Sequence, residues 1–242
     1  MIPVAAKARA TSMSNAPTTV DPIAGHALWS PSYDQTLNPV LALEQRLLLL
    51  ELGHLSGQRL LDAGCGTGRW MDLARERGAL AAGIDITPKI LTEAARKPGV
   101  QGRIAEADTA CLPFAAGSFS LAVCAFVFGY VERQEETIRE LARVVKPGGR
   151  IILSDLHPEA LRRRWTSSFR SGESVYEIQR RRYSLGEIRA AACSQGLQER
   201  KLVEAHFGEP ERSIFLRAGK AERFDEVTGI PAVFVLVWER VT

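Results

Sequence analysis

The stretch at positions 60–68, LLDAGCGTG, is the strongest constraint on how this chain can fold. Its apolar start predicts a buried strand that ends at Asp62, followed at once by glycines at 64, 66 and 68. Glycine allows backbone angles that are closed to other residues, and it leaves room for a ligand to lie against the main chain. Ligands bind at the carboxyl ends of strands in open α/β sheets. The stretch therefore predicts an α/β sheet with a binding site at this turn.

The spacing of the glycines narrows the class of site. A nicotinamide-binding loop has the pattern G-x-G-x-x-G, whereas this chain has an acid, Asp62, followed by G-x-G-x-G. The arrangement resembles motif I of the class I methyltransferases that use S-adenosylmethionine. The resemblance implies cofactor contacts at Asp62, Gly64, Cys65 and Gly66. For Asp62 the alternative is a simple cap on the next helix.

Two further acids follow in the expected order. Asp85 ends a second apolar run about 20 residues downstream, a position suited to accept hydrogen bonds from both hydroxyls of a ribose. The resemblance assigns the adenine amino group to Asp108, and it implies further cofactor contacts at Ile86 and Thr109, the residues that follow the two acids. The alternatives are an ordinary strand-end acid at Asp85 and a loop acid at Asp108.

The likeness continues along the chain. Residues 118–123 resemble the fourth strand of the family, and residues 141–153 resemble its turn into the fifth, here with the sequence VKPGG. Five signatures thus occur in order over residues 59–155. They are most similar to the small-molecule branch that contains the ubiquinone, menaquinone and biotin-pathway methyltransferases. This implies S-adenosylmethionine as cofactor, S-adenosylhomocysteine as product, and transfer of a methyl group to an N, O or C atom of a small-molecule acceptor.

Strand-like and helix-like segments alternate along the chain, which predicts an α/β fold with parallel pairing. We expect a Rossmann-like, doubly wound, mostly parallel seven-stranded sheet with helices on both faces. Two strand-like runs, 198–206 and 232–239, predict a closing antiparallel hairpin with no room for a full helix turned back between them. The resemblance implies the strand order 3-2-1-4-5-7-6.

The length of 242 residues, with 45% hydrophobic residues, suits one sizeable core. We expect residues 28–242 to form a single domain, with an N-terminal cap helix within 28–57 and a substrate cap inserted at 156–183. Residues 1–27 are interpreted as a disordered leader. The alternative is an organelle transit peptide, because the first 20 residues contain two basic residues and no acid.

Cysteine usage and hydropathy bear on the compartment. The four cysteines show no C-x-x-C pairing and are interpreted as reduced core thiols of a cytoplasmic protein, with neither a disulfide framework nor a metal site. No apolar run reaches the length of a membrane span. The net charge of only +3 disfavours a dedicated nucleic-acid binder. Nothing in the sequence predicts the oligomeric state.

Three residues are candidates for the acceptor side of the site. The resemblance places Tyr33 where relatives fold a tyrosine over the cofactor, so it is a candidate for both cofactor binding and catalysis. Tyr130 follows the fourth strand. His157 lies just past the fifth strand, where an imidazole could take a proton from a phenol or an enol. The alternative for His157 is a structural or solvated histidine.

The expected cap is basic and carries interleaved aromatic residues. Its arginines could recognise an anionic substrate or RNA, or they could form a solvated helix face with one edge strand; they are Arg162, Arg163, Arg164, Arg170, Arg180, Arg181 and Arg182. Two other function classes stay open, a nicotinamide-dependent oxidoreductase and a protein that binds S-adenosylmethionine without transferring its methyl group.

Overall fold

The computed structural model describes residues 16–241. Within this range a main sheet of seven strands runs in the order β4-β3-β2-β5-β6-β10-β9. Its strands are β2 (Arg59–Ala63), β3 (Leu80–Asp85), β4 (Ile104–Glu106), β5 (Phe119–Ala125), β6 (Val145–Leu156), β9 (Leu197–Ala205) and β10 (Val233–Arg240). β10 pairs antiparallel with both β6 and β9, and the remaining pairs are parallel. Counted along the main sheet, this is the predicted order 3-2-1-4-5-7-6.

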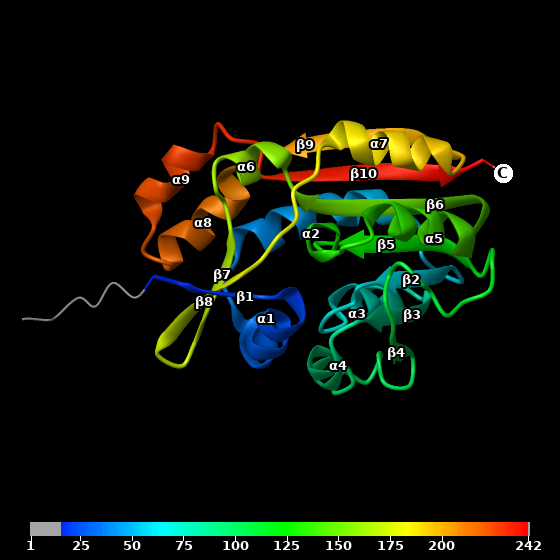
Figure 1. Ribbon diagram of the computed structural model, residues 1–242, viewed down its shortest axis with the longest axis horizontal. Helices are drawn as coiled ribbons and strands as arrows, with labels where there is room; N and C mark the ends of the chain where they lie inside the picture. Colours follow the sequence, from blue (N-terminus) through cyan, green and yellow to red (C-terminus); the bar gives the residue numbers. More distant parts are fainter. Residues whose placement is uncertain (1–15, 242) are drawn as a thin grey trace, which may run out of the picture.

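Helices cover both faces of the main sheet (Figure 1). One hydrophobic cluster joins the sheet to α2, α3, α8 and α9, and the other joins it to α5 and α7. The helices on the first face are α2 (Pro39–Leu52), α3 (Arg69–Glu76), α8 (Glu209–Arg217) and α9 (Ala221–Val227). Those on the second face are α5 (Gln134–Val144) and α7 (Leu185–Ser194). The doubly wound prediction is confirmed.

Local signals explain where several helices begin. Asn38 caps α2 by accepting a hydrogen bond from the Val40 N–H at 2.9 Å, with proline at the first helical position. Ser184 and Glu187 form the predicted capping box of α7. α4 (Pro88–Ala94) also begins with a proline. These helix starts could be predicted from the sequence because each depends on neighbouring residues alone.

The segment between the last two strands differs from the prediction. Two helices, α8 and α9, lie between β9 and β10, where we expected no room for a helix. α8 carries Pro210 in its first turn. Phe215 on α8 and Phe224 on α9 pack edge to face with their ring centroids 5.5 Å apart, within the core. Burial of these two rings stabilises helices whose surroundings in the sequence are polar.

The N-terminal region also differs from the prediction. Residues 1–15 of the expected leader lie outside the described residues. Residues 16–27, however, contribute β1 (Thr18–Val20) and most of α1 (Pro22–Trp29), which η1 (Ser30–Gln35) follows. β1 pairs in parallel with the cap insertion, so order in this segment comes from residues far away in the sequence.

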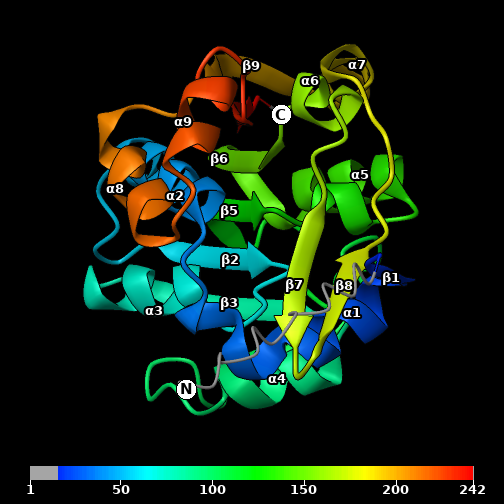
Figure 2. The same cartoon turned by 90° about the vertical axis from the view of Figure 1, so that its left-hand side faces the viewer.

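The insertion at 156–183 contains α6 (Pro158–Arg162), β7 (Ser167–Ser171) and β8 (Ser174–Ile178). β1, β8 and β7 form a second sheet, called the small sheet below. Its own core comprises Trp29, Phe169 and Ile178. Figure 2 shows the small sheet and α1 lying in front of the ends of the parallel strands. The binding site predicted at the ends of the parallel strands is therefore bounded by the main sheet on one side and by the small sheet with α1 on the other.

The cysteines are free, as predicted, but they are not all core thiols. Cys65 and Cys124 are buried, whereas Cys111 and Cys193 are exposed. Among the described residues, no helix combines the length and apolar character needed to cross a bilayer.

Candidate active site

The glycine turn after β2 has the geometry that its sequence predicts. Gly64, Gly66 and Gly68 have φ angles of 81°, 53° and 77°, in the left-handed region that favours glycine. The N–H groups of Gly64 and Cys65 donate to the Ile84 carbonyl at 2.8 and 2.7 Å. These bonds tie the turn to the neighbouring strand β3.

Gly64 and Gly66 have different structural roles. A Cβ on Gly64 would lie 2.3 Å from a methyl group of Val127, so this glycine allows the loop after β5 to approach. A Cβ on Gly66 would find its nearest neighbour, Ile90, at 3.7 Å. Gly66 therefore keeps space open at the surface of a cavity, and Gly64 makes the packing behind that surface possible.

Asp85 is fixed at the end of β3 by two backbone donors. Its Oδ2 accepts from the Gly66 N–H at 2.9 Å, and its Oδ1 accepts from the Thr87 N–H at 2.8 Å. Burial raises the pKa of Asp85, and these two hydrogen bonds oppose the shift. A carboxylate oxygen can accept more than one hydrogen bond. Asp85 thus holds the glycine turn and keeps acceptor capacity for a ligand.

Asp62 is almost completely buried, and its Oδ2 has no hydrogen-bond partner within the described part of the chain. Burial raises the pKa of Asp62 to about 7, although the nearby Arg69 guanidinium lowers it. A buried carboxylate without a full set of partners is costly. The site therefore favours a ligand that supplies a proton donor or a positive charge here.

Asp108 and Thr109 form the wall beyond β4. Asp108 accepts from the Ala110 N–H and forms an ion pair with Arg133, both at 2.8 Å. Partial burial opposes the shift, but these contacts lower the pKa of Asp108. The Thr109 hydroxyl lies 3.1 Å from that of Thr137. Asp108 is thus ionised, and one of its oxygens is shared with an exposed arginine.

The segment around η1 closes the site from the N-terminal side. Asp34 accepts a hydrogen bond from the Thr67 hydroxyl at 2.6 Å and forms an ion pair with Lys97 at 2.8 Å. These contacts attach the segment to the glycine turn and to the chain after α4. Tyr33 packs edge to face on Trp29, and burial raises its pKa. The Tyr33 hydroxyl is therefore protonated at neutral pH.

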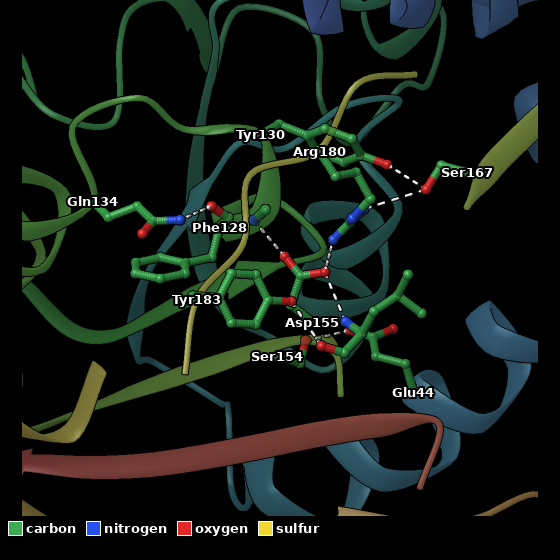
Figure 3. Close-up of polar contacts among 11 residues, drawn as sticks. Glu44, Phe128, Tyr130, Gln134, Ser154, Asp155, Ser167, Arg180 and Tyr183 are labelled. Carbon is green, nitrogen blue, oxygen red and sulfur yellow. Dashed lines mark hydrogen bonds and ion pairs between the residues drawn. The ribbon is translucent and has the colours of Figure 1, made fainter. Parts of the chain in front are cut away.

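A buried ion pair lies at the other end of the site, beyond β5 and β6 (Figure 3). The Arg180 guanidinium contacts the Asp155 carboxylate, with side chains only 7% and 0% exposed. Asp155 also accepts from the Gly129 N–H at 2.7 Å. The Arg180 guanidinium lies 4.2 Å from the centre of the Tyr130 ring, and the Tyr130 hydroxyl donates to Ser167 at 2.7 Å. Tyr130 is thus held in place by both its ring and its hydroxyl.

These parts line one cavity of about 820 Å³, within the range of small-molecule sites. It brings together all the predicted cofactor residues and two of the three acceptor-side candidates: Tyr33, Asp62, Gly64, Cys65, Gly66, Asp85, Ile86, Asp108, Thr109 and Tyr130. Sequence reasoning did not select His26, which also lines the cavity, and it counted Arg180 only among the cap arginines.

His157 is not among the residues that line this cavity. It caps α6, where its Nδ1 accepts from the Glu159 N–H at 3.0 Å. Its Nε2 lies 2.8 Å from Glu204. Both ring nitrogens have protein partners, so His157 has a structural position outside the cavity, which agrees with the structural alternative to a catalytic role.

The comparison with protein families agrees with this geometry. Residues 61–153 match the model of a methyltransferase domain. Residues 61–153 therefore carry a methyltransferase domain. A demethylmenaquinone methyltransferase of Thermus thermophilus is 38% identical over 106 residues, which are 42% of this chain and 48% of that protein. The chain thus matches only about half the length of this curated relative.

Solved structures extend the fold of the methyltransferase domain to most of the chain. An S-adenosylmethionine-dependent methyltransferase from Mesorhizobium loti matches with a TM-score of 0.65 and 23% identity, over 82% of this chain and 98% of that one. The (4+2)-cyclase SpnF matches with a TM-score of 0.63 and 19% identity, over 93% and 97% of the two chains. At these identities the likeness concerns the fold.

S-adenosylmethionine is the cofactor of this family, and the residues present fit it. Asp62 offers an unpartnered buried oxygen, which suits the cationic amino group. Asp85 keeps acceptor capacity for the ribose hydroxyls, and Asp108 offers a carboxylate for the adenine amino group. Gly66 leaves open space beside them. When bound, S-adenosylmethionine supplies an activated methyl group on a positively charged sulfur.

Proposed function

We propose that the protein transfers the methyl group of S-adenosylmethionine to a small-molecule acceptor enclosed beneath the small sheet. The observation that carries the proposal is one continuous cavity, which runs from the glycine turn and Asp85 to Tyr130 and Arg180. Its volume of about 820 Å³ supports a cofactor and a second molecule in one space. The homology to demethylmenaquinone methyltransferases supports an acceptor of small-molecule type.

Catalysis in such a site depends on position. The residues around Asp62 and Asp85 hold the cofactor, while Tyr33, Tyr130 and the small sheet surround the acceptor and exclude water. Holding the two reactants in line supplies a large part of the rate enhancement. A protein group that accepts the proton of the acceptor supplies more. The free cysteines support a cytoplasmic location for this chemistry.

The first test is binding and turnover. We expect S-adenosylhomocysteine to bind in calorimetry and NADH not to bind, since the glycine spacing differs from a nicotinamide loop. Mass spectrometry should then detect methyl transfer to members of a panel of hydroquinones, enols and amines. Binding of NADH without S-adenosylhomocysteine would contradict the proposal and favour an oxidoreductase.

One alternative has a specific observation behind it. The fold is also that of SpnF, which is named as a (4+2)-cyclase, so this fold occurs in a protein whose named activity is not methyl transfer. This supports, as an alternative, a protein that binds S-adenosylmethionine without transferring its methyl group. Tight binding of S-adenosylhomocysteine, with no methylated product from the panel or from a cell extract supplied with labelled cofactor, would favour this alternative.

A further inference from the structure

His26 on α1 is held in one tautomer. Its Nδ1 lies 2.8 Å from the Pro22 carbonyl oxygen. Because a carbonyl can only accept, Nδ1 must carry the proton in the neutral ring, and Nε2 is left with a free lone pair. No hydrogen bond involves Nε2 among the residues that the structure describes. The ring therefore presents a proton acceptor without a protein partner.

The ring of His26 lies at the cavity where the reaction would take place. His26 lines the cavity, and its ring meets the Tyr130 ring edge to face with centroids 4.7 Å apart. It interacts electrostatically with Asp85 on β3 and with Arg180 after β8. His26 thus lies between the end of the cavity that suits the cofactor and the end lined by Tyr130 and Arg180.

The packing of α1 keeps His26 there. A Cβ on Gly25 would lie 2.7 Å from Ile178, so α1 rests directly on β8 at this glycine. Asp21 caps the helix by accepting from the Ala24 N–H at 2.9 Å. Position and tautomer are therefore both fixed before any ligand binds.

The other candidates for a general base are less suitable. The Tyr130 hydroxyl donates to Ser167, burial keeps the Tyr33 hydroxyl protonated, and His157 lies outside the cavity with both nitrogens engaged. We propose that Nε2 of His26 is the general base of the proposed methyl transfer, and that the acceptor is therefore a phenol or an enol.

The proton transfer to His26 is part of the methyl transfer proposed above and rests on that proposed function. The acceptor oxygen forms the new bond to the methyl carbon, and the carbon–sulfur bond breaks with its electron pair on sulfur. The hydroxyl proton passes to Nε2 of His26 and then to solvent, which leaves S-adenosylhomocysteine and a methyl ether. Burial lowers the pKa of His26, with Asp85 raising it and Arg180 lowering it further. The ring is thus neutral at pH 7 and ready to accept a proton.

The tautomer can be tested without any acceptor. In a long-range ¹H–¹⁵N NMR spectrum of labelled protein, assigned with the His26→Gln variant, we expect the His26 proton on Nδ1 and an unprotonated Nε2. A proton on Nε2, or a ring that is charged at neutral pH, would overturn the proposal.

The kinetic test compares two acceptors. Hydroquinone must lose a proton to react, whereas thiophenolate is already ionised in mildly alkaline buffer. His26→Gln should lower kcat for hydroquinone by about a hundredfold or more and leave kcat for thiophenolate near the wild-type value. The control is His206→Gln, a change at an exposed histidine outside the cavity. Equal losses with both acceptors would show a structural role for His26 and overturn the proposal.

Calorimetry distinguishes a failure of the base assignment from a failure of the proposed function. If His26→Gln binds S-adenosylhomocysteine as the unchanged protein does, the kinetic result reports on the base. If the variant instead binds it much more weakly while kcat is kept, His26 is a cofactor contact and the base assignment is wrong. If the unchanged protein fails to bind S-adenosylhomocysteine, the proposed function itself fails.

Discussion

Carboxylates gather around the cavity with too few cations to neutralise them. Asp62 and Glu44 are buried and Asp85 is partly buried, and burial raises the pKa of each. Arg69 forms an ion pair with Glu44, at 2.6 Å. Charges in a low-dielectric site interact strongly. The protein thus maintains a negative potential where a cationic cofactor would bind, at a cost in stability when the site holds no ligand.

The first prediction concerns how much the buried carboxylate of Asp62 lowers the stability of the fold. Its folded pKa of about 7 lies above the ordinary value of 3.8, so stability is fully present below pH 4 and is lost as pH rises through 7. Asp62→Asn should raise the free energy of unfolding in mildly alkaline buffer by on the order of 1 to 4 kcal/mol. Urea unfolding checks this. No gain there, or an equal gain below about pH 4, would contradict the assigned pKa.

The second prediction concerns Asp85. Asp85→Ala removes the acceptor for the ribose hydroxyls and also the partner of the Gly66 N–H. Calorimetry should show that binding of S-adenosylhomocysteine weakens by about 2 kcal/mol or more. Asp225→Ala, at an exposed position on α9, is the matched control. Unchanged affinity in a folded Asp85→Ala variant would contradict the ribose assignment.

At the scale of elements, local motifs could be predicted from the sequence, whereas pairings between distant segments could not. The glycine turn, the starts of α2 and α7 and the strand order followed from neighbouring residues or from the family resemblance. β1 and α1 were missed because their partners, including Ile178 and Tyr130, lie more than a hundred residues downstream. His26 is not part of a sequence motif. We could propose its role only after the structure showed that its ring contacts Tyr130. For α8 the signal was present in Pro210, but the strand-like runs on either side dominated the interpretation.

The third prediction compares two glycines of one turn. Gly64→Val places side-chain atoms within 2.3 Å of the present position of Val127, so it should destabilise the fold. Gly66→Val extends into the cavity, so it should abolish S-adenosylhomocysteine binding with a smaller loss of stability from its φ of 53°. Thermal unfolding and calorimetry on both variants check this. Normal binding by Gly66→Val would show that the turn does not hold the cofactor.

The fourth prediction concerns the attachment of η1. Asp34→Ala removes the contacts with Thr67 and Lys97, of which the second is partly exposed and screened. A loss of ~1–2 kcal/mol should speed release of S-adenosylhomocysteine roughly five- to thirtyfold. Stopped-flow tryptophan fluorescence measures this rate. Asp34→Asn, which keeps an acceptor for Thr67, should give an intermediate value, and an unchanged rate in both would contradict the role.

At the scale of the whole molecule, four of the seven cap arginines have acidic partners. Arg162 and Arg163 both pair with Glu159, Arg181 pairs with Glu132 at 2.6 Å, and Arg180 is buried against Asp155. The sequence showed seven arginines in this segment but could not show which acids would face them. The pairing favours the solvated interpretation of most of these side chains over recognition of a polyanion.

The fifth prediction follows from that pairing. RNA should bind weakly and without sequence preference in a gel-shift titration at about 0.15 M salt. Replacing Arg162, Arg163 and Arg164 together by alanine should leave S-adenosylhomocysteine binding unchanged. Sub-micromolar, sequence-preferring RNA binding that the triple variant loses would favour an RNA methyltransferase instead.

The pairing of β1 with β8 has a consequence for folding. Thr18 pairs with Tyr176, so this contact closes a loop of roughly 160 residues. Because closing so long a loop costs conformational entropy, we expect the pair to form late in folding. Because the small sheet has its own core of three residues, we expect it to open while the main sheet stays folded. Amides of β1 and α1 should therefore exchange with deuterium long before those of β5 and β6. A bound ligand, by filling the space beneath them, should slow that exchange more than any other in the molecule.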